Sequence, residues 1–471
     1  MSLRNILNNQ SLVFTVGGSL PTILNLIFLP VYSNFLSPEE FGSFSYIMSF
    51  QTILIVVLSL CLNNFLLRDF FDAESEREIK INFGTIFIFL TIFNAVTVSL
   101  LFQIMPNVLF DEKSQDLSMY FRLMLTGLFF EYFFLFPQII FRVYRQAKFY
   151  VLFNITRQIL TFIISIYLIG TLDYGIEGRF ISIILINIIF AIVSLYLVNS
   201  KSIFRFDSSV LKKGIVYSLP ILPASIIGSV YVSLDKIILL EYISLEMLGI
   251  YTLAASIGSA INFISLGFYR AVEPNIFEDY ASEKLLQTIE NSYLFLLAIM
   301  SLFGLMISLF AKELLEIFFH PDFIESRNYV CFFVVAYIFN GQRRIFNTVL
   351  HAFKVTKYDL PLTVIGLIMF LFSFFILVPM IGVYGALVSI IIGSISSFIC
   401  TNLLVSRFIK VKAYSITLVF FCSLIFGLSI FFNLDILQSQ FAIFTLKMLI
   451  SLVCLSILII YLRRNPEIIP K

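Results

Sequence analysis

Ionisable side chains are rare inside the apolar stretches of this sequence, so each one found there is a candidate for chemistry. Glu131 lies well inside the stretch from residue 117 to 141. An ionised carboxylate is costly in such surroundings unless it faces water or a partner, because a low dielectric favours its protonated form. Reversible protonation of Glu131 would bias one conformation over another, which makes it our candidate for coupling or gating. The alternative is a structural ion pair with an arginine.

Rows of polar side chains follow one face of two stretches when they are read at the helical angle of about 100° per residue. In the stretch from 43 to 67 the row consists of Ser45, Ser49, Thr52 and Asn63. In the stretch from 247 to 272 the corresponding row consists of Thr252, Ser256, Ser259 and Arg270. Small polar residues also hold helices together in lipid, so a purely structural role is the alternative for each hydroxyl. Their repetition at matched positions favours a shared polar path.

The stretches from 117 to 141 and from 327 to 350 carry corresponding polar faces, offset by 209 positions. In the first, the face consists of Glu131, Gln138 and Arg142. In the second, it consists of Asn340, Arg344, Asn347 and His351. Arg142 and His351 lie near the ends of their stretches, so substrate contact and ordinary positive-inside placement are both open. We take both faces and both rows as candidate linings of a substrate cavity.

Two pairs of opposite charge are candidates for gating. Asp235 and Lys236 are adjacent near the end of the stretch from 214 to 240, although Lys236 could instead extend to the membrane interface. Arg270 and Glu273 are one helical turn apart and are expected to pair, either in a cytoplasmic gate or as an ordinary surface pair.

Several kinds of chemistry have no motif here. The sequence contains no Walker A loop, zinc signature or nucleophile elbow, and it has only two histidines. Its five cysteines are scattered through apolar stretches without metal-binding spacing. We therefore expect no enzyme activity, no cofactor and no ATP-driven pump within this chain, while coupling to a proton or sodium gradient stays open.

The elements that position these residues are membrane-spanning helices. With 59% hydrophobic and 13% charged residues, a water-soluble chain of 471 residues would expose large apolar patches. About 14 apolar stretches between positions 11 and 462 are long enough to cross a bilayer as helix. They are continuous and lack the alternation of barrel strands. The sequence therefore predicts an all-α integral membrane protein.

The basic residues predict the orientation. Most of the 31 Lys and Arg fall in alternate connections, and we assign Arg157, Arg343 and Arg344 to that side with the others. The positive-inside rule then places this side and both termini in the cytoplasm. The connections are short, and the first stretch has no small-residue cleavage site, so we expect a retained helix.

The chain is a duplicated unit. Ser37, Glu39 and Gly42 recur 207 positions later as Ser244, Glu246 and Gly249, and the same offset carries Gly175, Gly178 and Ser182 onto Gly382, Gly385 and Ser389. Each copy contains six stretches, so the copies enter the membrane in the same orientation, and we expect a pseudo-twofold axis along the membrane normal. The predicted organisation is a lobe at 1–206, a lobe at 207–412, and two additional helices at 413–471. The shared features are where we expect function.

Short motifs add a resemblance to a known family. They are LPVY at 29–32 with SPEEFG at 37–42, DKII at 235–238 leading to GIY at 249–251, and GVYGA at 382–386. In this order and spacing they resemble the Wzx-type polysaccharide flippases of the MOP (MATE-like) superfamily over nearly the whole chain. The first stretch has no basic residue, which departs from the lipid II flippases of the superfamily.

The resemblance implies a transporter of the bacterial inner membrane. Such a protein moves an undecaprenyl-diphosphate-linked oligosaccharide from the cytoplasmic to the periplasmic leaflet by alternating access, for O-antigen, capsule or exopolysaccharide synthesis. It also implies a cationic cavity, for which Arg142, Arg270 and Arg344 are the candidates, and a polysaccharide polymerase and chain-length regulator as partners beside the membrane lipids. Nucleic acid is not expected.

Two other functions are weighed against this one. A drug or cation antiporter of the same fold is expected to carry carboxylates in its cavity, particularly in the first stretch, which has none. A membrane-embedded polymerase or acyltransferase is expected to carry a large outer loop or a catalytic His or Asp constellation, and the sequence has neither.

Overall fold

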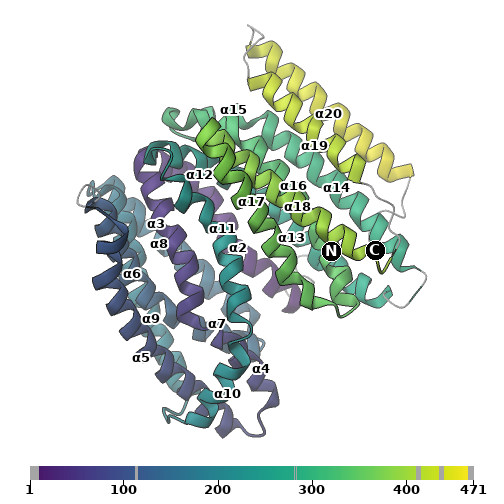
Figure 1. Cartoon of the computed structure of the whole chain (residues 1–471). Helices are drawn as coiled ribbons and strands as arrows, with labels where there is room; N and C mark the ends of the chain where they lie inside the picture. The colour runs from purple at the N-terminus through teal and green to yellow at the C-terminus, as the bar shows by residue number, and fades with distance from the viewer. Residues whose placement is uncertain are drawn as a thin grey trace. The chain divides into compact units, whose positions relative to one another are not determined.

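The computed structural model describes residues 10–111, 115–279, 282, 284–409, 415–433 and 440–464. Every regular element in these ranges is a helix (Figure 1). The chain divides into two compact units, Met1–Leu240 (unit 1) and Glu241–Lys471 (unit 2).

Unit 1 contains the first half of the helices. In chain order they are α2 (Gln10–Ser33), α3 (Pro38–Ser59), α4 (Leu62–Asp72), α5 (Glu76–Leu109), α6 (Gln115–Glu131), η2 (Tyr132–Phe134), α7 (Leu135–Val143), α8 (Ala147–Gly170), α9 (Gly175–Lys201), α10 (Ser208–Ser218) and α11 (Leu222–Leu239). Helix α11 packs against α3 and is therefore part of unit 1. The lobes proposed from the repeat, with boundaries at 206 and 412, stay a prediction.

Unit 2 contains the second half. In chain order its helices are α12 (Leu245–Ser259), α13 (Ile261–Asp279), α14 (Leu285–Leu309), α15 (Ala311–Phe318), η3 (Pro321–Ser326), α16 (Arg327–Ala352), η4 (Thr356–Tyr358), α17 (Asp359–Ile381), α18 (Val383–Val405), α19 (Ser415–Asn433) and α20 (Gln440–Arg464). Helix α16 packs against α12, α13, α14, α18 and α19, so it forms the centre of this unit.

The helices confirm the predicted membrane class. In the described part of the chain, ten helical segments are long and apolar enough to cross a membrane, and three shorter apolar helices lie within α2, α19 and α20. Helix α16, with three arginines in its 26 residues, matches the one remaining predicted stretch. All 14 predicted stretches therefore coincide with helices.

The repeated residues begin and end helices. Ser37 and Ser244 are the N-caps of α3 and α12, and each side chain accepts a hydrogen bond from a backbone N–H three residues later. Arg145 and Lys354, which correspond at an offset of 209, both have positive φ values, of 55° and 59°. Each follows the end of its helix, α7 or α16, as a left-handed C-terminal residue does. These repeated positions thus specify helix ends.

The repeated glycines build the same corner in both units. Gly175 and Gly382 have φ values of +49° and +58°, a conformation that favours glycine. Three residues later, a Cβ on Gly178 would lie 3.0 Å from the Cβ of Leu168, and one on Gly385 would lie 2.5 Å from the backbone of Leu377. The glycines therefore let consecutive helices approach closely, which gives this shared motif a structural role.

Four of the predicted stretches are interrupted helices. The stretch from 214 to 240 is divided between α10 and α11, and that from 247 to 272 between α12 and α13, so the row of Thr252, Ser256, Ser259 and Arg270 also lies on two helices. Leu60 and Cys61 are left-handed, with φ values of 47° and 55°, so α3 ends at Ser59 and α4 begins a new helix. The prediction of one continuous polar row from Ser45 to Asn63 is therefore wrong, because the two residues lie on different helices. The stretch around Glu131 is likewise divided by the 3₁₀ turn η2, a feature that often marks a functional hinge.

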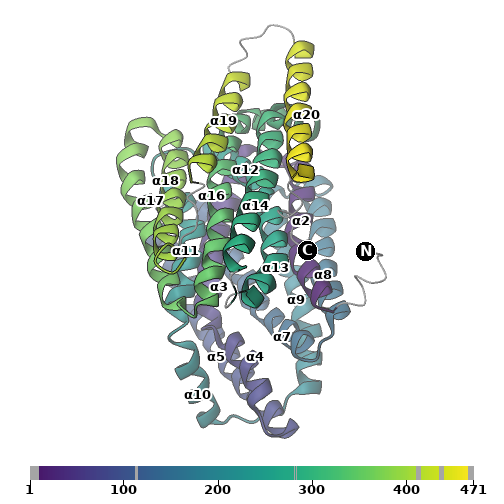
Figure 2. The ribbon, with the colours of Figure 1, turned by 90° about the vertical axis from the view of Figure 1, so that its right-hand side faces the viewer.

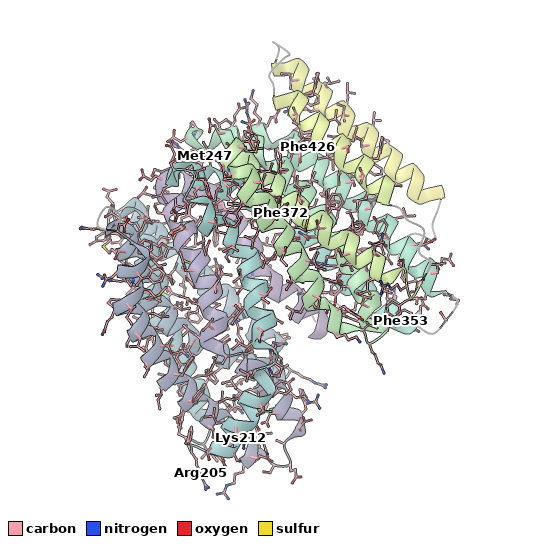
Figure 3. The ribbon with its side chains drawn as sticks, viewed as in Figure 1. Arg205, Lys212, Met247, Phe353, Phe372 and Phe426 are labelled. Atoms are coloured by element: carbon pink, nitrogen blue, oxygen red, sulfur yellow. The ribbon has the colours of Figure 1, made fainter. Side chains whose placement is uncertain are left out.

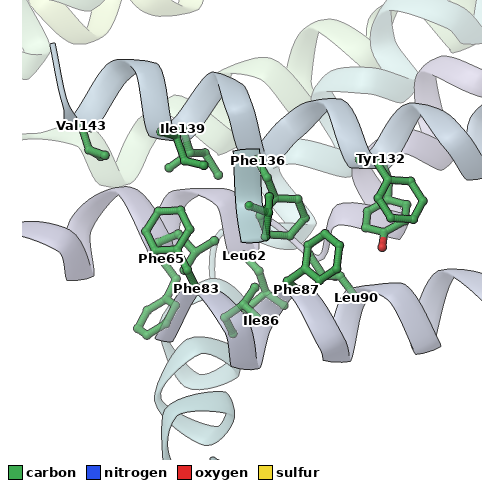
Figure 4. Packing of buried hydrophobic residues seen from close by; sticks show 14 of the residues in the cluster. Leu62, Phe65, Phe83, Ile86, Phe87, Leu90, Tyr132, Phe136, Ile139 and Val143 are labelled. Atoms are coloured by element: carbon green, nitrogen blue, oxygen red, sulfur yellow. The ribbon is translucent and has the colours of Figure 1, made fainter. Parts of the chain in front are cut away.

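Aromatic packing holds α4, α5 and α7 together in unit 1. Leu62 and Phe65 of α4 meet Ile86 and Phe87 of α5, and Phe136 of α7 covers them (Figure 4). The rings of Phe87 and Phe136 are 4.9 Å apart at a steep angle, an edge-to-face arrangement. Close packing of this kind replaces the hydrophobic effect as the cohesive force between helices in lipid.

The last two helices pack on unit 2 with one face. Helix α19 contacts α14 and α16, and α20 contacts α14 (Figure 2). Lys447 of α20 is 1% exposed, and its Nζ lies 2.8 Å from Oε1 of Glu313 in α15. Phe420 and Leu449 point outward on the opposite faces. Each of these helices therefore has one packed face and one outward face.

Candidate functional site

Glu131 lies at the centre of a polar cluster in unit 1. It is the last residue of α6, directly before η2. Its Oε1 lies 2.9 Å from Nη2 of Arg157 on α8, and its Oε2 accepts a hydrogen bond from Nε2 of Gln51 on α3 at 2.5 Å. The side chains of Glu131 and Arg157 are 15% and 20% exposed. A pair in this position stabilises both charges in surroundings where each alone is costly.

Arg157 is fixed by three more contacts. Its Nε and Nη2 both donate to Oδ1 of Asn187 on α9, at 3.2 and 2.8 Å. Asn187 in turn donates to the backbone carbonyl of Gly127 at 3.0 Å. The guanidinium carbon lies 4.3 Å from the centre of the Phe134 ring, which is a cation–π contact. Four helices, α3, α6, α8 and α9, thus meet at this cluster.

The placement of Arg157 corrects the sequence prediction. We assigned it to a cytoplasmic connection, but it is the eleventh residue of α8, which has 24 residues. Ten steps of about 1.5 Å place it roughly 15 Å along the helix. Sequence reasoning also missed Gln51 and Asn187 as partners. The one signal that could have found Arg157 is its position inside an apolar stretch that follows the stretch of Glu131.

The rest of the polar face of α7 continues toward α8. Gln138 donates to Asn154 at 3.1 Å, and Gln158, next to Arg157, donates to Asn25 of α2. Arg142, by contrast, is exposed near the end of α7. The predicted face of Glu131, Gln138 and Arg142 is therefore engaged by α8 through its first two members.

The hydroxyls of the predicted rows bond within their own helices. Ser49 donates to the carbonyl of Ser45, and Thr52 donates to that of Met48. In unit 2, Ser259 donates to the carbonyl of Ser256. Such bonds satisfy the hydroxyl without a partner helix. Thr52 is exposed and Ser45 and Ser259 are half-buried, so their role in a cavity stays a prediction.

The remaining polar residues of unit 1 form local contacts. Asn63 is half-buried at the start of α4, and its amide lies 3.4 Å from Oδ1 of Asn64. Asp235 is buried on α11, and its Oδ1 lies 3.2 Å from Nζ of the adjacent Lys236. Lys236 therefore neutralises Asp235 within α11, and a gating role for the two stays a prediction.

In unit 2, α13 and α16 form a second polar site, which we call the α13/α16 site. Arg344 of α16 is largely buried, and its Nη1 has no hydrogen-bond partner among the described residues. It lies close enough to Tyr269 and Arg270 of α13 to interact electrostatically with both. Oδ1 of Asn347, one turn further along α16, is likewise buried without a partner in the described chain. This site therefore presents unused hydrogen-bonding capacity beside positive charge.

Glu273 has a hydrogen-bond partner on its own helix. Tyr269 donates its hydroxyl to Oε1 of Glu273 at 2.7 Å, both on α13. Arg270 is exposed, and Glu273 is half-buried. The tyrosine thus holds the carboxylate, and a gating role for Glu273 stays a prediction.

The other predicted residues of α16 face α17 and α18. Asn340 donates to Oγ of Ser394 on α18 at 3.2 Å. His351 lies 2.6 Å from Oδ2 of Asp359, the first residue of α17. Together with the α13/α16 site, these contacts show that the polar face of α16 is divided between two neighbours.

Arg343 also lies inside unit 2. Its Nε and Nη2 donate to the hydroxyls of Thr401 and Thr363, at 3.2 and 3.0 Å. The prediction that Arg343 and Arg344 belong to a connection is therefore wrong, because both residues lie within α16. Arg344 is eight residues from the end of α16, which is about 12 Å along the helix.

The two sites differ in their chemistry. In the unit 1 cluster, a carboxylate and a guanidinium compensate each other's charge. In the α13/α16 site, an arginine with an unpaired donor lies near a second arginine, which suits an anionic ligand. Among the described residues, no group of three His, Cys, Asp or Glu side chains could hold a metal ion.

Solved structures show which class of protein has this fold. The chain is similar to the lipid II flippase MurJ in an inward closed conformation, with a TM-score of 0.73 and 13% identity over 96% of this chain and 99% of that one. It is similar to an inward-facing multidrug resistance MATE family transporter of the MOP superfamily, with a TM-score of 0.67 and 18% identity over 83% and 96%. For the Vibrio cholerae MATE transporter VcmN the TM-score is 0.60, with 14% identity over 86% and 97%. The fold is that of a multi-pass MOP transporter.

The family follows from the sequence itself. Residues 7–279 match the model of the polysaccharide biosynthesis protein family, and the chain belongs to that family. The predicted Wzx-type resemblance is thereby confirmed. No curated protein sequence matches the chain. The protein is a multi-pass membrane protein of the polysaccharide biosynthesis protein family, with the fold of the solved MOP transporters.

Proposed function

We propose that this transporter flips an undecaprenyl-diphosphate-linked oligosaccharide from the cytoplasmic to the outer leaflet of a bacterial inner membrane, by alternating access. The product would serve O-antigen, capsule or exopolysaccharide synthesis. The observation that carries the proposal is the α13/α16 site, where Arg344 has a buried, unpaired Nη1 beside the charge of Arg270. A family devoted to polysaccharide biosynthesis supplies the substrate class.

The chemistry of the substrate fits this site. A diphosphate offers several anionic oxygens, and a guanidinium binds phosphate oxygens through paired N–H groups. A hydrogen bond between charged groups contributes about 1.5–3 kcal/mol. The buried Nη1 of Arg344 is left unsatisfied without a ligand, which is costly for the protein alone. A bound phosphate oxygen would remove that cost.

The orientation of the proposal rests on the basic residues. Arg205 and Lys212 lie at the end of unit 1 that is formed by α4 and α10 (Figure 3). The positive-inside rule places such an end in the cytoplasm. With both termini on the cytoplasmic side, the lipid-linked substrate would enter from the leaflet in which it is made.

The geometry disfavours the drug or cation antiporter. Such a transporter needs a carboxylate that is free to bind a cation or a proton in exchange for one. Glu131 is the carboxylate inside the unit 1 cluster, and Arg157 already neutralises it at 2.9 Å. A cationic drug would therefore meet an arginine beside the carboxylate that should attract it.

The test is transport in reconstituted liposomes, with a fluorescent undecaprenyl-diphosphate-linked oligosaccharide as the substrate. Arg344→Ala is expected to reduce the flipping rate by about ten- to a hundredfold, which corresponds to one charged hydrogen bond. Arg344→Lys should retain part of the rate, because the charge remains without the planar fork. The same pair of substitutions at Arg270 tests the second arginine.

Arg407→Ala is the matched control, because Arg407 is an exposed arginine beyond the end of α18. Its rate should equal that of the unmodified protein. If Arg344→Ala and Arg270→Ala both transport at the control rate, the diphosphate site is refuted. If the unmodified protein moves a cationic dye but no lipid-linked sugar, the antiporter replaces the proposal.

A further inference from the structure

Arg157 has an unused donor although it lies in an ion pair. Its Nε and Nη2 serve Asn187 and Glu131, whereas Nη1 makes no hydrogen bond to any described residue. Glu131 contacts it through a single oxygen, because Gln51 takes the other. The pair is thus not the bidentate fork that arginine and carboxylate form at their strongest. The side chain also keeps 20% of its surface exposed.

The second copy shows that helix packing does not require these charges. Asn340 corresponds to Glu131 at an offset of 209, and Ser394 corresponds to Asn187 at an offset of 207. In unit 2 these two residues bond directly to each other at 3.2 Å. The same two helix positions are therefore joined in both units, once through neutral groups and once through an inserted arginine.

The position that corresponds to Arg157 makes the same point. At the offset of 209 it is Gly366, where a Cβ would lie 1.8 Å from Oγ of Ser397 and 3.1 Å from the carbonyl oxygen of Gly393. Helices α17 and α18 thus pack too closely there for any side chain. In unit 1, a guanidinium occupies the matching place between α8 and α9. At these matched positions, the charge pair is therefore specific to unit 1.

We propose that Arg157 is a second anion-binding residue of the transport path, with Glu131 as its internal counter-ion. It would bind a carboxylate or phosphate oxygen of the transported head group. Asn187 and Phe134 hold the guanidinium in place, so it is preorganised for an incoming anion. This inference rests on the proposed function, since it assigns a second contact to the same class of substrate.

Glu131 is the group that an incoming anion has to displace. The anion replaces Glu131 as the partner of Arg157. From the helices packed around it, Glu131 meets Gln51 of α3, Arg157 of α8 and, through Arg157, Asn187 of α9. Arg157 is the one charged group among these contacts. The exchange makes and breaks non-covalent contacts only.

The chain contains no tryptophan, so a single introduced indole can report on this site. Phe134→Trp places the indole under the guanidinium of Arg157, whose departure or reorientation changes its fluorescence. Purified protein is titrated with inorganic pyrophosphate and, separately, with glucuronate, at constant ionic strength. The expected result is a saturable change in fluorescence. Pyrophosphate and glucuronate distinguish a phosphate from a carboxylate ligand.

Two variants on the Phe134→Trp background give the sharpest comparison. Glu131→Gln removes the competing counter-ion, so the half-saturation concentration should fall about tenfold. Arg157→Gln should abolish the saturable change. Arg343→Gln is the matched control, because that arginine bonds to threonines, and it should leave the titration unchanged.

A second measurement keeps the test valid if the indole disturbs η2. Pyrophosphate should raise the thermal unfolding temperature of the otherwise unmodified protein, and raise that of Glu131→Gln further. The inference is overturned if neither anion gives a saturable response, or if Arg157→Gln responds as the parent does. Failure here, with transport still abolished by Arg344→Ala, would leave the proposed function intact. Failure of lipid-linked transport would leave the anion titration at Arg157 interpretable by itself.

Discussion

Breaking the pair of Glu131 and Arg157 one partner at a time should cost unequal amounts of stability. Glu131→Gln keeps an acceptor for Gln51 and loses the charged contact at 2.9 Å, which is worth about 2 kcal/mol. Arg157→Gln leaves a carboxylate without its counter-ion and removes two hydrogen bonds to Asn187. We expect a loss of about 3 kcal/mol, the low end for a broken buried pair, because both side chains are partly exposed.

The stability of the double variant, Glu131→Gln with Arg157→Gln, gives the coupling between the two residues. The two glutamines of the double variant leave no uncompensated charge. The double variant should therefore lose about 2–3 kcal/mol of unfolding free energy, whereas the losses of the two single variants sum to about 5 kcal/mol. The coupling between the two residues is then about 2–3 kcal/mol. The matched control is the neutral joint of unit 2, in which Asn340→Ala and Ser394→Ala should couple by about 0.6 kcal/mol, typical of a polar contact between membrane helices.

The assay is thermal unfolding of the purified protein in detergent, at one fixed scan rate because unfolding of such proteins is commonly irreversible. At about 2.1 cal/mol/K per residue, cooperative unfolding of the 240 residues of unit 1 shifts by about 2 °C per kcal/mol, so Glu131→Gln should lower the apparent Tm by about 4 °C and Arg157→Gln by about 6 °C. The double variant should resemble one of the single variants. Additive losses at the charged pair would refute the reasoning, since they would mean that each side chain acts without the other.

Two further predictions concern the ends of the units. Lys447→Met should destabilise unit 2 by about 3 kcal/mol, because it leaves Glu313 without its counter-ion. Adding Glu313→Gln should recover most of the lost unfolding temperature. If the double variant unfolds at the same temperature as Lys447→Met, the lysine acts by packing alone. Asp207 caps α10, and the backbone N–H of Ser209 lowers the pKa of its carboxyl. The stabilisation by the Asp207 carboxylate is complete above the pKa of the unfolded state, about 4, and is lost as the pH falls through the lower pKa of the folded state. Asp207→Asn should therefore flatten the pH dependence of the unfolding temperature in that acidic range. An unchanged pH profile in the variant would contradict the prediction.

Local signals in the sequence determined the elements and their ends. A continuous apolar run needs only its own length to become a membrane helix, which is why the predicted stretches coincide with helices. Ser37 and Ser244 cap their helices through neighbouring backbone groups, and Gly175 and Gly382 supply a left-handed conformation that other residues adopt poorly. The Wzx-type family was likewise readable from motifs, because those motifs include the same caps and corners.

The tertiary structure decided which charges meet. The left-handed residues Leu60 and Cys61 carry no sequence signal for a break, so the row from Ser45 to Asn63 was read as continuous. The sequence offered an ion pair of Glu131 with an arginine as an alternative, but it did not specify Arg157 as the partner. A charge inside a membrane helix is stabilised by whichever polar group the neighbouring helix brings within about 3 Å, and that depends on helix rotation and crossing. Such contacts join residues far apart in the chain, and only the packed helices select them.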